Sequence, residues 1–472
     1  MNIPLIIVLI YIIVLYVISW YSTKLSKNGG ILGYLLAGRG FPAGIVAVML
    51  AGLAVGGAST IGVAENAYKA GISAGWYNAA WAAGAIVVGL VIADKYRKLE
   101  VSTVPELFER YFDTSGRIIA VIGQIVIQIV ITSLQYVAGG AILAALLPGI
   151  FTFKTGMLTS AIVFIGITLI GGYWAAGLSN VINVTVIYFG IILGVILSLK
   201  DIGGFTNLSA SLPAGEHWFS PFMGVGIAVV IANFVVMITQ TFSTQAVVQI
   251  SFAAKDAKNA KLGFILAGLI ILPVGFLSAI LGIVAAAKFP GIKPALALPQ
   301  TIMALNPWAA GLVLAGLWAA DVSTAVGLLL GSSTLVVEDI WKRFIQPEIP
   351  EKQQLLLSRG IVLVISLLTY FLATSVLGII KTLLIGLTLT TSYTVVLLFL
   401  VFAPRYCKKG SAFWTILTGI IYLALWQFVP AIRIVPHPIY LAWPVALVTF
   451  FLVYFLDSRP TKNYSKETTI SS

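Results

Sequence analysis

Long apolar runs, each with few or no charges, follow one another along almost the whole chain. About 20 apolar residues cross the hydrocarbon core of a bilayer as a helix. Charged residues make up only 9% of the sequence, against roughly 25% in a soluble domain. We therefore expect an all-α polytopic membrane protein with about thirteen transmembrane helices. They are expected near residues 3–22, 41–66, 72–94, 117–147, 156–175, 177–199, 221–249, 261–288, 308–336, 356–374, 376–403, 411–430 and 438–457.

Basic residues gather in alternate loops between these runs, beginning with the loop after the first run. Cytoplasmic loops are enriched in Lys and Arg, so this alternation predicts an N-terminus outside and a C-terminus in the cytoplasm. We expect a multi-pass protein of the plasma membrane. The same distribution argues against nucleic-acid binding, although the net charge is +12.

The sequence lacks the usual patterns of catalytic and metal-binding residues. Glu65, Asp94 and Asp321 are the plausible catalytic carboxylates near the runs, and no histidine is expected within their reach. Cys407 is the single cysteine, so it forms no internal disulfide. We expect a protein that is not an enzyme.

The second apolar run carries glycines and hydroxyl residues in its middle, from Gly52 to Gly62. Glycine weakens a helix interior by about 1 kcal/mol relative to alanine. A break here would free backbone carbonyls for a cation and bring a helix end near a ligand. A close, glycine-mediated helix crossing would explain the same residues equally well.

The seventh run becomes polar from Thr239 to Gln245 and apolar again at Val247. So many amides and hydroxyls at membrane depth need partners or water. The return to apolar residues favours a second broken helix over an early end of the span.

The ninth run contains Asp321, Ser323 and Thr324. The two hydroxyls are hard oxygen ligands that suit an alkali cation, although lone hydroxyls in helices usually bond back to their own helix. A carboxylate inside a membrane span indicates a functional site. Asp321 could pair with Lys381, bind a cationic solute or relay a proton.

The two candidate broken helices are five helices apart. Interrupted helices at corresponding places in two halves indicate an inverted-repeat transporter with its binding site near the bilayer midplane.

One loop also has a structural signature. Thr103 and Glu106 fit a capping box with Pro105 in the first turn, which predicts a short cytoplasmic helix over about 104–112.

Several short motifs, in order over roughly residues 3–430, resemble the sodium/solute symporters, the group that contains sodium–galactose, sodium–proline and sodium–sialic acid transporters. The motifs are Tyr34 to Arg39, the Ala58 to Gly62 region, Thr103 to Glu106, Gly171-Gly172, Gln249 with Ala253 to Lys255, and Ser323-Thr324 followed by Glu338 to Ile340.

The resemblance implies a five-plus-five inverted-repeat core in which the first and sixth core helices are broken. The core would span 41–403, with repeats over 41–199 and 221–403. An extra helix and a cytoplasmic loop would precede it at 1–40. Two helices at 404–457 and a cytoplasmic tail at 458–472 would follow.

The resemblance also implies a sodium site between the first and eighth core helices. Its ligands, carried over by position, would be the carbonyls of Gly52, Val55 and Ala320 and the hydroxyls of Ser323 and Thr324. Positions that match solute contacts are Ser59, Asn78, Thr244 and Gln245, with Gln128 and Gln135 as looser candidates.

Some positions depart from the family pattern. Asn180 stands where relatives often have an aspartate that is tied to sodium handling. Val326 and Gly327 lack the hydroxyls of a second ion site, which favours one sodium per solute. Asp321 matches no position of the pattern and, with Asn180, is a possible coupling residue.

The expected function is sodium-coupled import of a small polar organic solute, such as an amino acid or a small carboxylate, by alternating access. The expected partners are Na⁺ as coupling ion, the solute and the lipid bilayer, with the chain working as a monomer. The alternative is a proton-coupled transporter of a cationic or neutral solute that uses Asp321.

Overall fold

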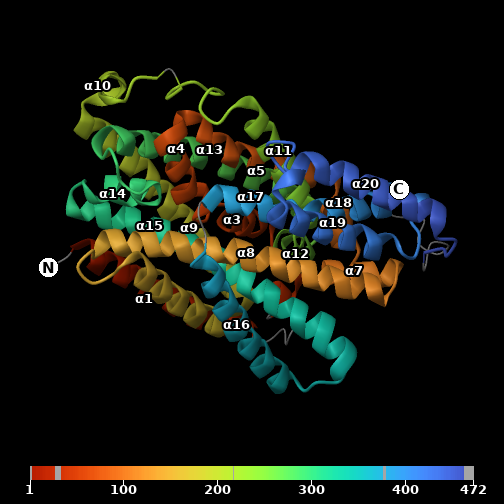
Figure 1. The fold of residues 1–472 in the computed structure, drawn as a ribbon. Coiled ribbons are helices and arrows are strands. Elements are labelled where there is room, and N and C mark those ends of the chain that lie inside the picture. Colours follow the sequence, from red (N-terminus) through yellow and green to blue (C-terminus); the bar gives the residue numbers. More distant parts are fainter. Residues whose placement is uncertain (1–2, 27–32, 34, 216, 376–378, 462–472) are drawn as a thin grey trace.

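The computed structural model describes residues 3–26, 33, 35–215, 217–375 and 379–461. For a few helical residues, Lys381 among them, it describes the backbone alone. The described residues are nearly all helical and form no β-strand (Figure 1). Tyr34 and the tail beyond residue 461 lie outside this description.

The first half of the chain forms α1 (Ile3–Ser26), η2 (Ala37–Arg39), α3 (Ala43–Ala54), η3 (Ala58–Gly62), α4 (Val63–Ala70), η4 (Gly71–Gly75), α5 (Trp76–Val91), α6 (Ala93–Lys98), α7 (Val104–Tyr111), α8 (Thr114–Leu146), α9 (Phe153–Ile202) and α10 (Gly204–Ser211).

The second half forms α11 (Ile227–Ser243), α12 (Gln245–Ala253), α13 (Ala257–Lys288), η5 (Pro294–Leu296), α14 (Ala297–Met303), α15 (Pro307–Thr334), η6 (Leu335–Ile345), α16 (Glu351–Ala373), α17 (Ile379–Leu387), α18 (Thr390–Phe402), η7 (Pro404–Tyr406), α19 (Ser411–Phe428), η8 (Pro430–Ile432) and α20 (Ile439–Leu456).

Among the described residues, 11 helical stretches are long and apolar enough to cross a membrane, and the bent pair α11–α12 would make 12. The expected count of about thirteen is therefore not confirmed. The difference lies in the runs expected at 41–66 and 72–94. They appear as one apolar stretch, Ala58–Val91, preceded by the 12-residue helix α3.

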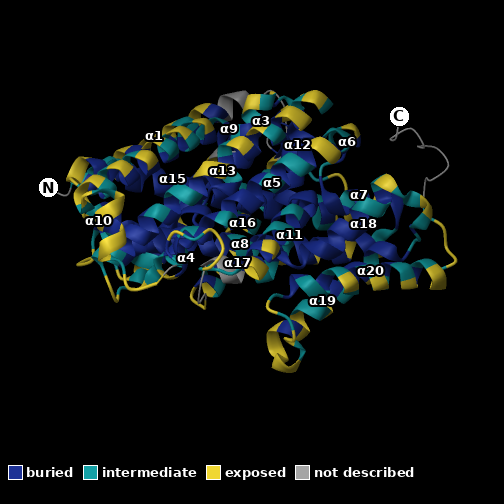
Figure 2. Ribbon diagram, turned by 90° about the horizontal axis from the view of Figure 1, so that it is seen from above, coloured by how far each residue is buried: buried dark blue, intermediate teal, exposed yellow. Residues whose placement is uncertain are grey.

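Helix α15 lies in the middle of the bundle and the peripheral helices surround it. In the most apolar part of Pro307–Ile345, which contains α15, 89% of the residues are buried, against 28% in the corresponding parts of α1, α16 and α20. Figure 2 shows the same gradient, with dark blue ribbon inside and yellow on the outer helices. The exposed apolar side chains of the outer helices match a surface that faces lipid.

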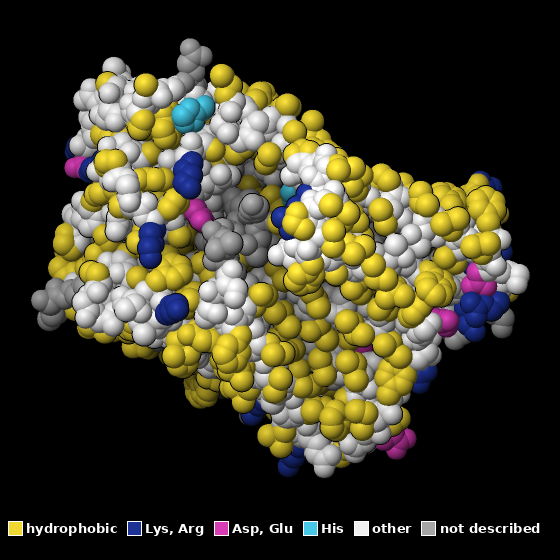
Figure 3. All heavy atoms as spheres, in the orientation of Figure 1, with side chains coloured by type: hydrophobic (Ala, Val, Ile, Leu, Met, Phe, Trp, Pro, Cys, Tyr) yellow, Lys and Arg dark blue, Asp and Glu magenta, His cyan; other side chains and the backbone are white. Residues whose placement is uncertain are grey.

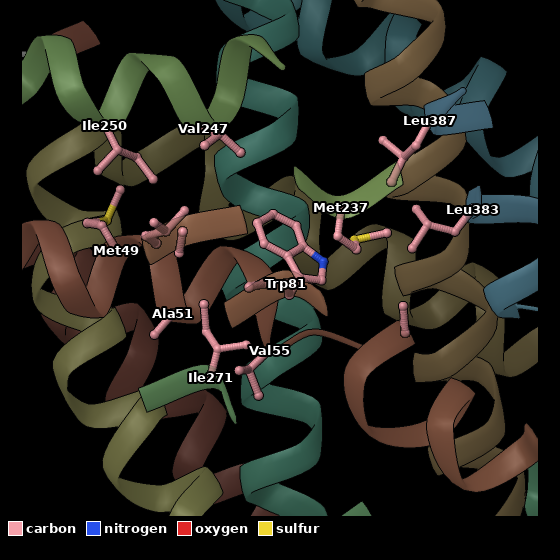
Figure 4. Packing of buried hydrophobic residues seen from close by; sticks show 14 of the residues in the cluster. Met49, Ala51, Val55, Trp81, Met237, Val247, Ile250, Ile271, Leu383 and Leu387 are labelled. Atoms are coloured by element: carbon pink, nitrogen blue, oxygen red, sulfur yellow. The ribbon is translucent and has the colours of Figure 1, made fainter. Parts of the chain in front are cut away.

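The packed interior joins residues that are distant in sequence. Val55 follows α3, and it belongs to one buried cluster with Trp81 of α5, Val247 of α12, Ile271 of α13 and Leu383 of α17 (Figure 4). Both broken segments of the chain therefore lie inside the same core.

The loops predicted to be cytoplasmic meet at one end of the bundle. Arg39 donates to the carbonyl of Glu100 at 2.8 Å, and Arg97 donates to the carbonyl of Ala254 at 2.5 Å. Phe41 forms a parallel β-bridge with Ala254. Segments that follow the first, third and seventh predicted spans are thus joined, as the alternation of basic loops requires.

The loops predicted to be external meet at the other end. The Tyr68 hydroxyl donates to the carbonyl of Phe289 at 2.7 Å, and the Ile72 amide donates to the carbonyl of Trp218 at 2.8 Å. In Figure 1 the start of α1 and helix α10 both lie toward this end, and α7 lies at the opposite end with the last turns of α20. In Figure 3 hydrophobic side chains cover most of the sides, and most charged side chains lie toward the two ends.

One half of the predicted capping box is present, and it begins the short helix α7. The Thr103 hydroxyl accepts from the Glu106 amide at 3.1 Å. The Glu106 carboxylate reaches back to the amide of Ser102 at 2.8 Å. The prediction of a helix over about 104–112 is confirmed.

Two series of helices each begin with a broken segment. In the first series α3, η3 and α4 precede α5, α8 and α9. In the second series α11 and α12 precede α13, α15 and α16. The inverted relation between the two series, and the domain boundaries that depend on it, remain predictions.

Candidate ion and solute site

The first core helix is interrupted between α3 and η3. Helix α3 ends at Ala54, and Val55 has the non-helical angles φ −91° and ψ 62°. The chain resumes as a short π-helical turn at Ala58 and continues into α4. The break expected in the second apolar run is therefore present.

Glycine is required at this break because other helices approach the backbone very closely. A Cβ atom on Gly56 would lie 2.6 Å from both the Gln135 side-chain oxygen and the Thr324 hydroxyl. A Cβ atom on Gly57 would lie 2.3 Å from Ala138. Both distances are far below van der Waals contact, so α8 and α15 can pack here only against glycine.

The hydroxyls of α15 contact the end of α3. Thr324 donates to the carbonyls of Gly52 at 2.9 Å and Leu53 at 3.3 Å. Ser323 donates to the Gly52 carbonyl at 3.1 Å and to the Ala320 carbonyl at 2.9 Å. We call these five residues the oxygen cluster. Four of them are predicted sodium ligands, and only Leu53 was not predicted.

The remaining predicted sodium ligand, Val55, lies three residues beyond Gly52. Its side chain is buried and its amide donates to the Ala51 carbonyl at 2.7 Å. In the described part of the chain, no hydrogen bond joins its carbonyl to α15.

Asn180 of α9 lies directly against the oxygen cluster. Its side-chain amide is 2.6 Å from the position that a Cβ on Gly52 would take. Asn180 and Ser323 together line two small cavities of about 10 Å³ each. Such a volume holds about one water-sized particle. The possible coupling residue Asn180 is therefore next to the predicted ion site.

The sixth core helix is interrupted at Thr244. Helices α11 and α12 meet there at a bend of 50°. Gln124 of α8 satisfies both backbone groups at the bend: its side-chain nitrogen donates to the Ser243 carbonyl at 2.7 Å, and its side-chain oxygen accepts from the Gln245 amide at 2.9 Å. The second predicted break is therefore present.

Two of the predicted solute contacts lie at the first break. Ser59 of η3 is fully buried, and its hydroxyl donates to the Ala54 carbonyl. The Gln135 side-chain oxygen accepts from the Gly57 amide at 2.8 Å. The polar groups of Ser59 and Gln135 are thus held by the broken backbone.

Thr244 and Gln245 lie at the second break, and their side chains have partners. The Thr244 hydroxyl donates to the Gln240 side-chain oxygen at 3.1 Å. The Gln245 side-chain oxygen accepts from the Val104 amide at 2.8 Å, which ties it to the start of α7.

Asn78 of α5 and Gln128 of α8 are buried between helices. Asn78 packs against Gly275 of α13, and Gln128 packs against Gly331 of α15. Both side chains are fully buried, and their amide atoms have no hydrogen-bond partner among the described residues. The role of Asn78 and Gln128 as solute contacts stays a prediction.

Asp321 lies at the first break, in the interior of the bundle. It is fully buried, and one carboxylate oxygen is 2.8 Å from the position of a Cβ on Gly57. Neither carboxylate oxygen has a hydrogen-bond partner among the described residues. The side chain of Lys381, the partner considered from the sequence, lies outside the description.

A charged network links α7, α8 and η6 at the end that holds the basic loops. Glu109 bonds to Arg117 at 2.5 Å and to Arg343 at 2.9 Å, and Arg117 also bonds to Asp339. Burial raises the pKa of Glu109, but the hydrogen bonds from Arg343 and Arg117 outweigh it and lower that pKa to about 2. The Asp339 carboxylate also accepts from the Thr103 hydroxyl at 2.9 Å, which fixes the start of α7.

Sequence reasoning missed two members of the site. Leu53 contributes a backbone carbonyl, for which its side chain gives no signal. Gln124 is a buried glutamine in an apolar run, like Gln128 and Gln135 on the same helix. Three glutamines in one apolar run are conspicuous in the sequence, but the sequence does not show which backbone groups each side chain bonds to.

The comparisons with known proteins agree with this architecture. The sodium:solute symporter family matches residues 34–419. The osmoregulated proline transporter of Bacillus subtilis is 25% identical over 394 residues, which cover 79% of this chain and 78% of that protein. The sodium/proline symporter of Haemophilus influenzae is 26% identical over 455 residues, which cover 87% and 85%.

Solved structures share the fold at low sequence identity. A substrate-bound, outward-open Na⁺-coupled sialic acid symporter is similar with a TM-score of 0.80 at 18% identity, covering 98% of both chains. A nucleobase-cation-symport-1 family transporter is similar with a TM-score of 0.59 at 14% identity, covering 89% of this chain and 92% of that one. Since the family match extends over most of the sequence, the chain belongs to the sodium:solute symporter family, and Na⁺ is its coupling ion.

Proposed function

We propose that this chain is a symporter that imports a small polar organic solute together with Na⁺ by alternating access. The solute class is an amino acid, a small carboxylate or a similar compound. In this proposal Na⁺ binds to the carbonyls of Gly52, Val55 and Ala320 and the hydroxyls of Ser323 and Thr324.

The observation that carries the proposal is the contact between two helices in the oxygen cluster. The hydroxyls of Ser323 and Thr324 point at carbonyls of the broken helix, at 2.9–3.3 Å. When a cation enters, these hydroxyls can rotate and turn their lone pairs toward it, because a hydroxyl both donates and accepts. Bound Na⁺ would then join α3 to α15 and favour one arrangement of the two helices.

Neutral ligands suit an ion that must leave again. Carbonyl and hydroxyl oxygens replace the hydration shell of a cation without adding a full opposite charge. A site without a carboxylate in its cluster would therefore release Na⁺ into a cytoplasm where the ion is scarce. Asn180, a neutral amide beside the cluster, fits the same requirement.

The solute would bind beside the ion, next to the two breaks. Ser59 and Gln135 at the first break and Thr244 at the second offer neutral polar groups. Asn78, Gln128 and Gln245 remain candidates through the family resemblance. Several relatives are named proline transporters, so L-proline is the first solute to test.

The energy available from one Na⁺ supports accumulation. Moving one charge through 100 mV contributes about 2.3 kcal/mol. A tenfold Na⁺ gradient adds about 1.4 kcal/mol, and together these terms sustain roughly 500-fold accumulation. This use of the gradient needs the orientation that we propose: a plasma-membrane location, an external N-terminus and a cytoplasmic C-terminus.

The test is uptake into proteoliposomes that contain the purified chain. Labelled L-proline, and then a panel of amino acids and small carboxylates, would be added with an inward Na⁺ gradient or a matched K⁺ gradient. We expect uptake only with Na⁺. Equal uptake under both gradients, for a solute that is taken up, would reject sodium-coupled transport.

The proton-coupled alternative has a separate test in the same vesicles. If Asp321 relays the coupling proton, Asp321→Asn should abolish gradient-driven uptake while a proton gradient drives the unmodified chain. The family match favours Na⁺, so we expect no uptake driven by a proton gradient alone.

A further inference from the structure

Asp321 is a buried acid that the proposed sodium site does not use. It is 0% exposed, and among the described residues neither of its oxygens has a hydrogen-bond partner. An ionised carboxylate is very unfavourable in such surroundings unless a cation or several donors compensate it. This position therefore needs either a proton or a positively charged partner.

The surroundings of Asp321 provide further oxygen atoms. The position of a Cβ on Gly57 is 2.8 Å from an Asp321 oxygen and 3.4 Å from the Gln135 side-chain oxygen. The position of a Cβ on Gly56 is 2.6 Å from that same Gln135 oxygen and 2.6 Å from the Thr324 hydroxyl. Oxygen atoms of three side chains thus line the backbone of these two glycines in a row.

This row of oxygen atoms runs from Asp321 to Thr324. Thr324 belongs to the oxygen cluster, whereas Asp321 does not. Asp321 and Ser323 are two residues apart on α15, and Ser323 contacts Gly52, five residues before Gly57. A cation beside Asp321 and a cation in the oxygen cluster would therefore occupy different ends of the break.

We propose that Asp321 is a second cation-binding position, which takes one monovalent cation beside Gly57 with help from the Gln135 oxygen. The cation is either a second Na⁺ or the ammonium group of the solute. One carboxylate with neutral neighbours suits a single charge, whereas Ca²⁺ takes 6–8 oxygen ligands that commonly include several carboxylates. Among the described residues no group of three or more His, Cys, Asp or Glu forms a metal site.

The inference has a consequence for the solute. A carboxylate at the break repels an anionic group at the same place. Only the ammonium arm rests on the proposed function, since a second Na⁺ can be measured without any solute. If the ammonium group binds there, the anionic end of the solute must lie away from Asp321.

The experiment measures cation binding directly on the purified full-length chain. Equilibrium binding of ²²Na⁺ in detergent gives the number of ions bound per chain. Thermal stabilisation by L-proline, pyrrolidine and cyclopentanecarboxylate separates the two halves of an amino acid, because pyrrolidine carries only the amine and cyclopentanecarboxylate only the carboxylate. The variants are Asp321→Asn, Thr324→Ala and the double variant Asp321→Asn, Lys381→Gln.

The two arms predict different results. If a second Na⁺ binds, the unmodified chain binds two Na⁺ and Asp321→Asn binds one, whereas Thr324→Ala still binds two, one of them about tenfold more weakly. If the ammonium group binds, Asp321→Asn leaves the Na⁺ count unchanged. It then weakens pyrrolidine and L-proline by roughly 10- to 100-fold, as expected for a lost charge-assisted contact. Cyclopentanecarboxylate should not be weakened.

Two results would overturn the inference. An Asp321→Asn variant that elutes as a single species and keeps both the Na⁺ count and the amine affinities shows a carboxyl that binds no cation. If Asp321→Asn lowers the Na⁺ count or the amine affinities and the double variant restores them, Lys381 is the permanent partner of Asp321. Failure of the proposed function looks different: the unmodified chain would then bind no Na⁺ at all.

Discussion

Gln124→Leu should destabilise the break between α11 and α12. The Gln124 side chain is fully buried, and it bonds to the Ser243 carbonyl at 2.7 Å and to the Gln245 amide at 2.9 Å. Leucine keeps a similar volume but offers neither a donor nor an acceptor. Both backbone groups at the bend would then lose their partner inside the core.

The expected loss follows from these two contacts. A buried backbone group that loses its partner costs about 1–3 kcal/mol, so the pair costs about 2–6 kcal/mol. Gln128→Leu is the matched control, one helical turn further along α8. Gln128 is equally buried, but its amide atoms have no partner among the described residues, so the same substitution removes no hydrogen bond.

Thermal unfolding in detergent, followed by tryptophan fluorescence, measures the difference between the two variants. One kcal/mol shifts the midpoint by about 2–4 °C in chains of 150–250 residues and by less in longer ones, so we expect Gln124→Leu to unfold on the order of 5 °C below Gln128→Leu. Sodium-driven uptake should fall with Gln124→Leu as the bend loses its shape. Equal midpoints for the two variants would refute the role assigned to Gln124.

Three further predictions concern other parts of the site. Thr324→Ala should weaken Na⁺ binding by roughly tenfold through the loss of one ligand, whereas Thr334→Ala, whose hydroxyl bonds back to its own helix at 2.9 Å, should leave Na⁺ binding unchanged. Gly52→Ala would place a Cβ 2.6 Å from the side-chain amide of Asn180 on α9. We expect this clash to destabilise the chain by about 1–3 kcal/mol, measured by thermal unfolding. Gly44→Ala on the same helix meets nothing within 4 Å and should be neutral or stabilising. Since Glu109 has a pKa of about 2 when folded and 4.5 otherwise, its ionised form stabilises the fold above pH 4.5 and this stabilisation disappears as the pH falls toward 2. Glu109→Gln should therefore show a shallower loss of thermal stability over that pH range, and an equally steep loss would contradict the assignment.

Local sequence information accounts for the elements of the fold. A run of apolar residues forms a helix in lipid because every backbone group must be bonded within the segment. The glycines around Gly56 and the polar stretch before Gln245 weaken two of these helices, and both breaks occur there. Thr103 and Glu106 predict α7 because a capping box acts within a single turn.

Contacts between helices were predicted less well. The position of Ser323 and Thr324 on α15 suggested an ion site, and the structure brings their hydroxyls to Gly52. Nothing in the sequence singled out the Leu53 carbonyl. Nor did the sequence distinguish Gln124 from Gln128, which are one turn apart on the same apolar helix.

The glycines around Gly56 fitted a break or a close helix crossing equally well, but the sequence predicted a bundle of membrane helices, a break in the seventh apolar run, and the loops that share an end of the bundle. These properties depend on the length, the composition and the charge of single segments. Only the packed helices show that Gln124 bonds to the backbone at the bend, that Gln245 bonds to the start of α7, and that Asp321 faces Gly57. A helix that is apolar on all sides carries no periodic signal for the face that meets its neighbours, so its rotation is set only when the helices pack against one another.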